Sequence, residues 1–327
     1  MADKDRQSGL VFAYRLDGKG GGKLLGWDEV AEWKPGKGAL WLHLDYQSED
    51  SKRWLAEDSG LDEITLEGLL ERDPRPRAVC SDTGIQLILR GVNHNEGAQP
   101  EDMVSVRIWV EAHRIISLRH RKIMAAKVVR DRIAQHRGPK RVGQCVVTLI
   151  DGILDDLALV SDELDDAVAK LEDQVLSPEE CDLQRSLAHW RRRAIALKRY
   201  IAPQRDVLSR LDGEPASWLT QIDRLQLREL ANRLTRILED LDAARAQAAI
   251  TQEEVTNQLA ELTNKRLYVL SVVAAVFLPL GMVTALWGVN VGGIPLQDSP
   301  MGFLIITGSL VVLLGLELIL FRALRWL

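Results

Sequence analysis

The sequence predicts an α+β cytoplasmic domain, followed by long stalk helices and two C-terminal transmembrane α-helices. Stretches in which apolar and polar residues alternate, as they do in strands, are confined to about the first 140 residues. From Ala216 to Leu278 there is neither Gly nor Pro, so nothing interrupts a long helix there. From Leu267 to Gln297 there is no acidic or basic side chain, which is typical of a membrane span.

Residues 1–141 are predicted to form the α/β domain. Its strand candidates are residues 10–16, 39–45, 85–92, 104–110 and 114–120, and residues 111–113 are the expected hairpin turn between the last two. Helical spacing of apolar residues is present at 48–60 and 62–73, and the sequence DPRPR at 73–77 ends the second helix. The segment KGGGK at 19–23 lacks the GK[ST] ending of a phosphate-binding loop, so we expect a glycine turn.

Residues 142–217 are predicted to form a hairpin of two helices with opposite charge. Residues 151–173 hold nine acidic side chains and one basic one, whereas residues 185–199 hold six basic side chains and no acid. The acidic carboxylates either pair with the basic helix or form a surface that concentrates divalent cations. The second interpretation involves Asp155, Asp156, Asp162, Glu163, Asp165 and Asp166. A long stalk helix, residues 218–266, is expected to follow and to continue into the membrane.

Residues 267–289 and 301–321 each have the length of a membrane span. The first segment holds 23 residues without a charge, and the second holds 21 residues with one charge, Glu317. At a rise of about 1.5 Å per residue, both are long enough for a hydrocarbon core of about 30 Å. We therefore expect two passes through a lipid bilayer.

The charges that flank the two spans predict their orientation. Lys265 and Arg266 precede the first span, and the tail at residues 322–327 holds two arginines. The loop between the spans, residues 290–300, carries a single aspartate. Because basic residues are retained on the cytoplasmic side, both termini are expected in the cytoplasm and the loop on the opposite side.

The composition argues against several classes of function. The net charge of −5 is too small to indicate a nucleic-acid partner. The three cysteines, Cys80, Cys145 and Cys181, form no CxxC pair, which argues against a disulfide framework or a thiolate zinc site. The chain has no nucleophile elbow, HExxH or Walker motif, so we expect neither an enzyme nor a bound cofactor.

One face of the first span is mostly small or polar. Its candidate pore-lining residues recur at heptad spacing: Asn264, Leu267, Ser271, Ala274, Leu278, Gly281 and Ala285. This stripe is either a close helix contact through small residues or a pore wall that faces a hydrated ion. Because two spans per chain cannot enclose an aqueous path, a pore requires several copies around an axis. The stripe contains no His or Cys, so no tight metal site is predicted in it.

The stripe ends at Gly288, Val289 and Asn290, where the apolar run stops. Asn290 either caps the helix, because Asn tolerates the left-handed conformation, or offers a neutral oxygen to a cation's water shell at a pore mouth. This GVN triplet, at the end of the first of two C-terminal spans, resembles the GMN signature of the CorA-type divalent cation transporters.

The chain is similar to the ZntB branch of that superfamily, on three further features. These are the sequence VGGIP after the triplet, RPR at 75–77 and RYIAPQRDV at 199–207. The resemblance covers nearly the whole chain and implies a homopentameric funnel in the bacterial inner membrane, with five first spans around a central pore. It also implies that the GVN triplet is the selectivity motif at the periplasmic mouth. Trp287 departs from the Tyr or Phe that is usual before the triplet, but it is also aromatic.

The resemblance implies transport of Zn²⁺, with Cd²⁺, Ni²⁺, Co²⁺ and Mg²⁺ as further candidates. A magnesium or cobalt transporter of the same superfamily is the first alternative, because no side chain of the stripe demands zinc. A membrane-anchored coiled-coil scaffold is the alternative from another class. The expected partners of a transporter are further copies of the chain, the lipid bilayer and divalent cations. A scaffold would oligomerise through its stalk and bind a protein through its α/β domain.

Overall fold

The computed structural model describes residues 9–175, 183–289, 294–295 and 299–324. The chain forms two compact units, Met1–Gln252 and Glu253–Leu327, which divide within the longest helix. The mixed α/β N-terminal part, the long helix and the two C-terminal apolar helices are confirmed. The finer division into seven segments stays a prediction.

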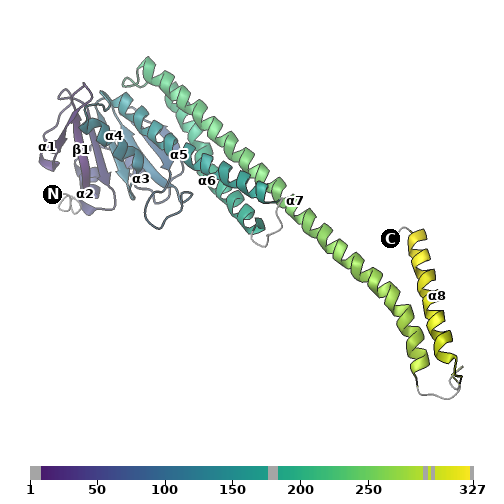
Figure 1. The fold of residues 1–327 in the computed structure, drawn as a ribbon. Helices are drawn as coiled ribbons and strands as arrows, with labels where there is room; N and C mark the ends of the chain where they lie inside the picture. Colours follow the sequence, from purple (N-terminus) through teal and green to yellow (C-terminus); the bar gives the residue numbers. More distant parts are fainter. Residues whose placement is uncertain (1–8, 176–182, 290–293, 296–298, 325–327) are drawn as a thin grey trace. The chain divides into compact units, whose positions relative to one another are not determined.

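A sheet of seven strands forms the N-terminal part of the first unit (Figure 1). Its strand order is β2-β1-β3-β7-β6-β5-β4, and all neighbours are antiparallel except β3 and β7. The strands are β1 (Leu10–Leu16), β2 (Gly22–Leu25), β3 (Leu40–Asp45), β4 (Arg77–Cys80), β5 (Ile85–Gly91), β6 (Val104–Val110) and β7 (Arg114–Arg119). The five predicted strands are present. The prediction missed β2 and β4, which have four residues each and form the two edges of the sheet.

Helices cover both faces of this sheet. The helices before the longest one are α1 (Trp27–Ala31), α2 (Glu49–Glu57), α3 (Glu63–Leu70), α4 (Met124–Ala134), α5 (Val142–Gln174) and α6 (Leu183–Gly213). The longest helix, α7 (Gln221–Gly288), runs from the first unit into the second, and α8 (Gly302–Ala323) belongs to the second unit. On one face, Leu55 of α2 and Leu69 of α3 pack in a buried cluster with Leu42, Leu44 and Trp109 of the strands. On the other face, α5 and α6 contact β5, and α4 packs on α5.

The glycine-rich segment between β1 and β2 is a turn, as predicted. Asp17 Oδ1 accepts hydrogen bonds from the backbone N–H groups of Lys19 at 2.7 Å and Gly21 at 3.0 Å. These hydrogen bonds, that from Lys19 above all, hold the pKa of the Asp17 carboxyl below its ordinary value. Gly18 and Gly20 have φ angles of 75° and 110°, which residues with a Cβ rarely adopt.

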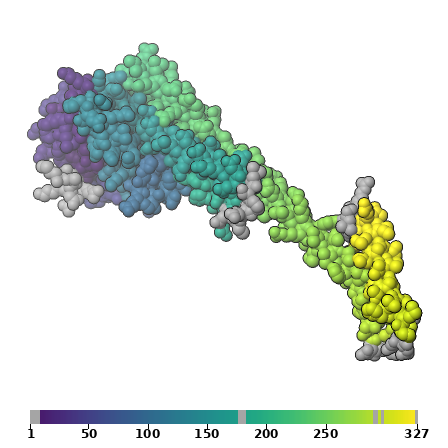
Figure 2. Space-filling model, viewed as in Figure 1, coloured from purple at the N-terminus to yellow at the C-terminus, as the bar shows by residue number. Residues whose placement is uncertain are grey.

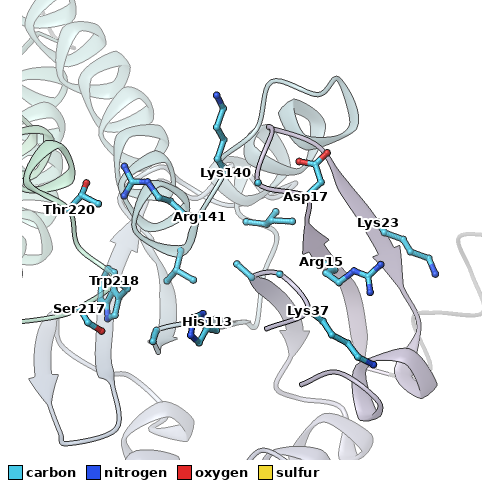
Figure 3. Close-up of a pocket in the computed structure, with 16 residues that line it drawn as sticks. Arg15, Asp17, Lys23, Lys37, His113, Lys140, Arg141, Ser217, Trp218 and Thr220 are labelled. Carbon is cyan, nitrogen blue, oxygen red and sulfur yellow. The ribbon is translucent and has the colours of Figure 1, made fainter. Parts of the chain in front are cut away.

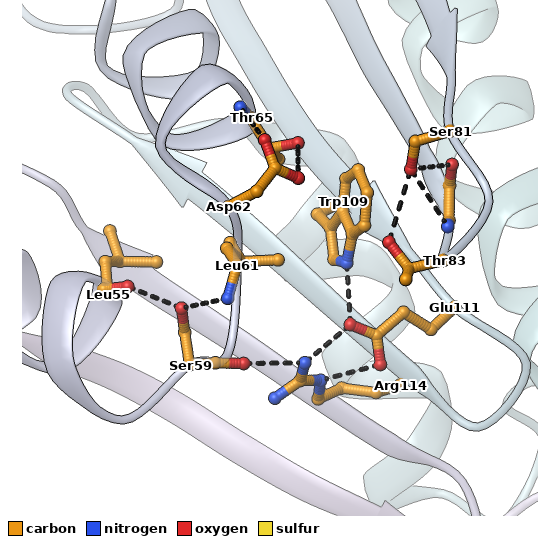
Figure 4. A network of polar contacts seen from close by, with 11 residues as sticks. Leu55, Ser59, Leu61, Asp62, Thr65, Ser81, Thr83, Trp109, Glu111 and Arg114 are labelled. Carbon is orange, nitrogen blue, oxygen red and sulfur yellow. Dashed lines mark hydrogen bonds and ion pairs between the residues drawn. The ribbon is translucent and has the colours of Figure 1, made fainter.

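A polar network ties the β6–β7 hairpin to the loop between α2 and α3 (Figure 4). Trp109 Nε1 donates a hydrogen bond to Glu111 Oε1 at 2.7 Å. Arg114 Nε donates to Glu111 Oε2 at 3.1 Å, and Arg114 Nη2 donates to the backbone oxygen of Ser59 at 2.8 Å. The predicted hairpin around residues 111–113 is therefore present and held in place.

The part of α7 in the first unit packs beside α5 and α6, as Figure 2 shows. Lys198 Nζ of α6 lies 2.6 Å from Asp242 Oδ2 of α7. α7 is a single helix of 68 residues, in agreement with the prediction, although it includes Pro279. The proline is tolerated inside this helix because neighbouring groups in a membrane can bond to the backbone carbonyl that loses its hydrogen bond.

Asp223 joins the start of α7 to the start of α5. Its carboxylate is fully buried, pairs with Arg141, and accepts hydrogen bonds from Thr220 N at 2.9 Å and Thr220 Oγ1 at 2.8 Å. A Cβ on Gly143 would come within 2.6 Å of this carboxylate and of the Trp218 backbone oxygen. Glycine at position 143 therefore allows the close approach of the two helices.

Candidate functional site

The second unit holds the two helices that are long and apolar enough to span a membrane, the end of α7 and all of α8. α8 returns alongside the end of α7 in the opposite direction (Figures 1 and 2). Large apolar side chains are exposed in the single chain, among them Phe277, Leu278 and Phe303 at 68%, 70% and 79%. Exposed apolar surface on this scale indicates contact with lipid or with further protein.

The GVN triplet lies where α7 ends. Gly288 is the last residue of α7, and no described atom would lie within 4 Å of a Cβ at this position. Val289 follows with 48% of its surface exposed. Asn290 lies outside the described residues, so its position at a pore mouth stays a prediction.

The candidate pore-lining stripe faces away from α8. Val272, Val276, Leu280 and Val283 are half-buried and form one row at helical spacing. Because α8 is the other described helix of the second unit, this row is the side of α7 that faces α8. At about 100° per residue, the stripe lies roughly half a helical turn from that row. In the stripe, Ala274 is half-buried and the other six residues are exposed: Asn264, Leu267, Ser271, Leu278, Gly281 and Ala285.

Glu317 is the one acidic residue of α8. Its side chain is half-buried, on the same helical row as the half-buried Leu310, Leu313 and Leu314. Both of its carboxylate oxygens are buried and have no hydrogen-bond partner among the described residues. Burying a carboxylate in apolar surroundings without a hydrogen-bond partner is costly. The single chain does not provide such a partner among its described residues.

The acidic residues of α5 divide into a paired and an unpaired group. Arg233 Nη1 of α7 lies 2.7 Å from Asp155 Oδ1, and Arg193 Nη2 of α6 lies 3.2 Å from Glu163 Oε2. Of the six acidic residues singled out from the sequence of α5, three are exposed and make no ion pair within the described part of the chain: Asp162, Asp165 and Asp166. Pairing with the basic helix therefore involves Glu163, while the unpaired carboxylates remain available to attract cations.

Asp156 belongs to the paired group through the loop between β5 and β6. His94 Nε2 of that loop lies 3.4 Å from Asp156 Oδ2. Burial raises the pKa of Asp156, and the neighbouring His94 opposes this rise. The pKa of Asp151 is also raised, first by burial and then by the charge of Asp155. Asp151 and Asp156 therefore lose their negative charge earlier than free carboxylates do as the pH falls.

No tight metal site is formed by the part of the chain that the structure describes, because no three His, Cys, Asp or Glu side chains there come close enough to hold an ion. The ring of His120 packs on Tyr46, with centroids 5.9 Å apart. His113 is exposed on the β6–β7 hairpin. Neither position contributes to a cluster of metal ligands.

Arg90, which was not predicted as a site residue, connects the two stretches of the first unit that carry part of the resemblance. Its Nη2 pairs with Asp73 and donates to the Pro74 backbone oxygen at 2.8 Å, at the start of DPRPR. Its guanidinium lies 4.8 Å from the centroid of the Tyr200 ring, and its backbone N–H donates to Gln204 Oε1 at 3.0 Å. The available signal was a basic residue in a mostly apolar strand, since a buried arginine requires partners.

Fold and site together define a membrane protein with an N-terminal α/β part, a long helix and two C-terminal apolar helices. The family model described as CorA-like Mg²⁺ transporter protein matches residues 36–323. The chain therefore belongs to this family.

Relatives resemble the chain over nearly its whole length. It is 37% identical over 306 residues to the zinc transport protein ZntB of Yersinia enterocolitica, covering 94% of this chain and 92% of the relative. It is 38% identical over 337 residues to the divalent cation transporter CmaX of Pseudomonas aeruginosa, covering 98% of each. The solved structure of full-length CmaX superposes with a TM-score of 0.86 at 36% identity, covering 98% of this chain and 99% of that one.

Proposed function

We propose that this chain transports divalent cations, zinc first, through a pore shared by five copies in a bacterial inner membrane. The observation that carries the proposal is the stripe of small and polar residues on α7, which faces away from α8 in a chain of this family. The names of the two relatives, a zinc transport protein and a divalent cation transporter, support the choice of cargo. The basic flanks of both spans support cytoplasmic termini.

The proposed pathway uses three parts of the chain. The unpaired carboxylates of α5 raise the local concentration of cations in the cytoplasmic part. Five copies of the α7 stripe form the wall of the pore, and hydroxyls, carbonyls and carboxamides face the water shell of the ion. The GVN triplet forms the selectivity motif at the periplasmic mouth. No cofactor and no covalent step is needed.

The test is zinc flux into proteoliposomes that contain only this protein. Flux should exceed that into protein-free vesicles, and an equal flux would favour the membrane-anchored scaffold. The pore is tested with Ala285→Trp, which places a large ring in the stripe and should abolish flux. Leu286→Trp, one residue away and outside the stripe, is the matched control and should retain flux.

The same vesicles decide between cargoes. Magnesium and cobalt remain the alternative because the family description names Mg²⁺ and the stripe offers no ligand that demands zinc. Higher flux of magnesium than of zinc at equal concentration would replace zinc by magnesium as the main cargo.

A further inference from the structure

A cavity whose charged lining residues are mostly basic lies at one end of the sheet in the first unit (Figure 3). Its volume is about 860 Å³, within the range of about 300–1,000 Å³ for small-molecule sites. It is formed by the end of β1, the β1–β2 turn, the loop before β3, the β6–β7 hairpin, the start of α5 and the loop before α7. Its charged lining residues, apart from His113, are five basic and one acidic: Arg15, Lys23, Lys37, Lys140, Arg141 and Asp17.

Part of this charge is already neutralised inside the protein. Lys23 Nζ lies 2.6 Å from Glu29 Oε1, and Arg141 pairs with the buried Asp223. The carboxylate of Asp17 is engaged by the backbone amides of its own turn. Three lining cations make no ion pair with another described residue: Arg15, Lys37 and Lys140.

These three cations stand on different segments around the cavity. Figure 3 shows Arg15 and Lys37 on one side, Lys140 and His113 nearer the middle with Arg141 beside Lys140, and Ser217 on the opposite side from Arg15 and Lys37. Lys37 and Lys140 are exposed and long, so they can turn toward an anion without a change in the backbone. A cavity of this volume with separated charges suits a ligand with several negative charges in a row, and a single halide ion would leave most of it unfilled.

We propose that this cavity binds a small molecule with a diphosphate or longer phosphate chain, either inorganic or part of a nucleotide. Lys140, Lys37 and Arg15 provide the charge-assisted hydrogen bonds to the phosphate oxygens, and the exposed hydroxyl of Ser217 adds a neutral donor. The site lies wholly within the first unit and is independent of the transport function proposed above.

The test is equilibrium dialysis of the full chain in detergent against radiolabelled pyrophosphate. The buffer contains EDTA, because phosphate chains bind divalent cations and would otherwise report on the transported metal. The cavity variant Arg15→Gln/Lys37→Gln/Lys140→Gln should bind pyrophosphate at least about tenfold more weakly, as expected for the loss of charge-assisted contacts. The variant Lys127→Gln/Lys170→Gln/Arg192→Gln removes the same charge from exposed positions on α4, α5 and α6, and should stay within about twofold of the wild type.

Competition with unlabelled adenosine diphosphate then identifies the source of the phosphate chain. Displacement at a lower concentration than unlabelled pyrophosphate assigns the site to nucleotides, and displacement at an equal or higher concentration assigns it to inorganic chains. If the triple cavity variant does not fold, the double variant Lys37→Gln/Lys140→Gln serves in its place, since both side chains are exposed. The proposal is overturned by the absence of saturable binding to the wild type, by equal losses in the cavity and control variants, or by displacement with chloride as effective as with pyrophosphate.

Discussion

His43 is a fully buried histidine whose hydrogen bonds indicate its tautomer and whose burial lowers its pKa. Ser117 Oγ donates to the Leu42 backbone oxygen at 3.0 Å, and Trp41 Nε1 donates to Ser117 Oγ at 2.9 Å. His43 Nδ1 lies 2.8 Å from Ser117 Oγ. Because the single proton of this hydroxyl is donated to the Leu42 backbone oxygen, Nδ1 carries a hydrogen and donates it to Ser117 Oγ. Burial, followed by the charges of two arginines, lowers the pKa of His43 to about 3.

This pKa predicts that the protein loses stability in mild acid. Above pH 6.5, the ordinary value, His43 is neutral in both the folded and the unfolded chain. Below pH 6.5 His43 binds a proton in the unfolded chain, but in the folded chain it does so only near pH 3. The free energy of unfolding therefore falls as the pH falls from 6.5 to about 3. The expected loss from this residue at pH 5 is about 2 kcal/mol.

The measurement is the unfolding temperature of the detergent-solubilised chain from pH 8 to pH 5. His43→Asn keeps a donor near the Nδ1 position and removes the titration, so its unfolding temperature should depend less on pH than that of the wild type. His189→Asn changes an exposed histidine and should leave the wild-type dependence unchanged. Identical pH dependence in all three proteins would show that His43 does not titrate as stated.

Asn290 is predicted to act directly on the ion at the pore mouth. A carboxamide accepts hydrogen bonds from a cation's water shell without holding the ion as a ring of carboxylates would, and conduction requires both entry and release. Asn290→Ala should keep assembly and reduce zinc flux roughly tenfold, the effect of about 1.4 kcal/mol on a barrier. Asn290→Asp should tighten metal binding and slow release.

Zinc flux and zinc affinity in proteoliposomes separate these outcomes. Asn232→Ala changes an exposed asparagine of α7 in the first unit and is the control that should transport normally. Normal flux in Asn290→Ala would mean that Asn290 only caps the helix. The GVN triplet would then not be a selectivity motif.

At the scale of elements, the acidic helix α5 now allows a sharper test than its sequence did. Asp155 and Glu163 form ion pairs with neighbouring helices and Asp156 contacts His94, so neutralising them would change stability as well as charge. Neutralising only the unpaired residues tests cation attraction alone. The variant is Asp162→Asn/Asp165→Asn/Asp166→Asn.

This variant should lower zinc flux several-fold at low metal concentration and little at saturating metal. The effect should shrink with added salt, because charges are screened over about 8 Å at 0.15 M. The control Glu57→Gln/Asp58→Asn/Glu67→Gln neutralises three exposed carboxylates of the α/β part and should leave flux unchanged. Equal fluxes of the wild type and the α5 variant at low metal concentration would mean that these carboxylates only form a solvent-exposed face of the helix.

The elements also show which features the sequence could predict. The five longer strands and the single helix α7 were predictable, because periodicity and the absence of Gly and Pro are local signals. The strands β2 and β4 were not, since four residues are too short for a periodic pattern and both form by pairing with a neighbour at the sheet edge. The partners of α5 were not predictable either: Arg233 of α7 and His94 of a loop come close only in the folded chain.

At the scale of the whole molecule, the second unit has features that a single chain does not satisfy. The stripe on α7 is exposed on the side away from α8, and the buried carboxylate of Glu317 has no partner among the described residues. Two spans also cannot enclose an aqueous path. Each of these points favours assembly of several chains through their membrane spans.

The resemblance to the CorA-type transporters implies five copies, so we expect the chain, solubilised in mild detergent, to have a native protein mass of five times its 36.6 kDa. Light scattering corrected for bound detergent measures this mass. If the contacts lie on the stripe, Gly281→Leu should weaken the assembly, because small residues allow helices to approach closely, whereas Leu320→Ile, on an exposed position of α8, should not. Removing residues 1–141 should leave part of the assembly, since α7 and α8 remain. A mass of one or two chains for the wild type under these conditions would contradict the shared pore, because neither number of copies can surround a path with two spans each.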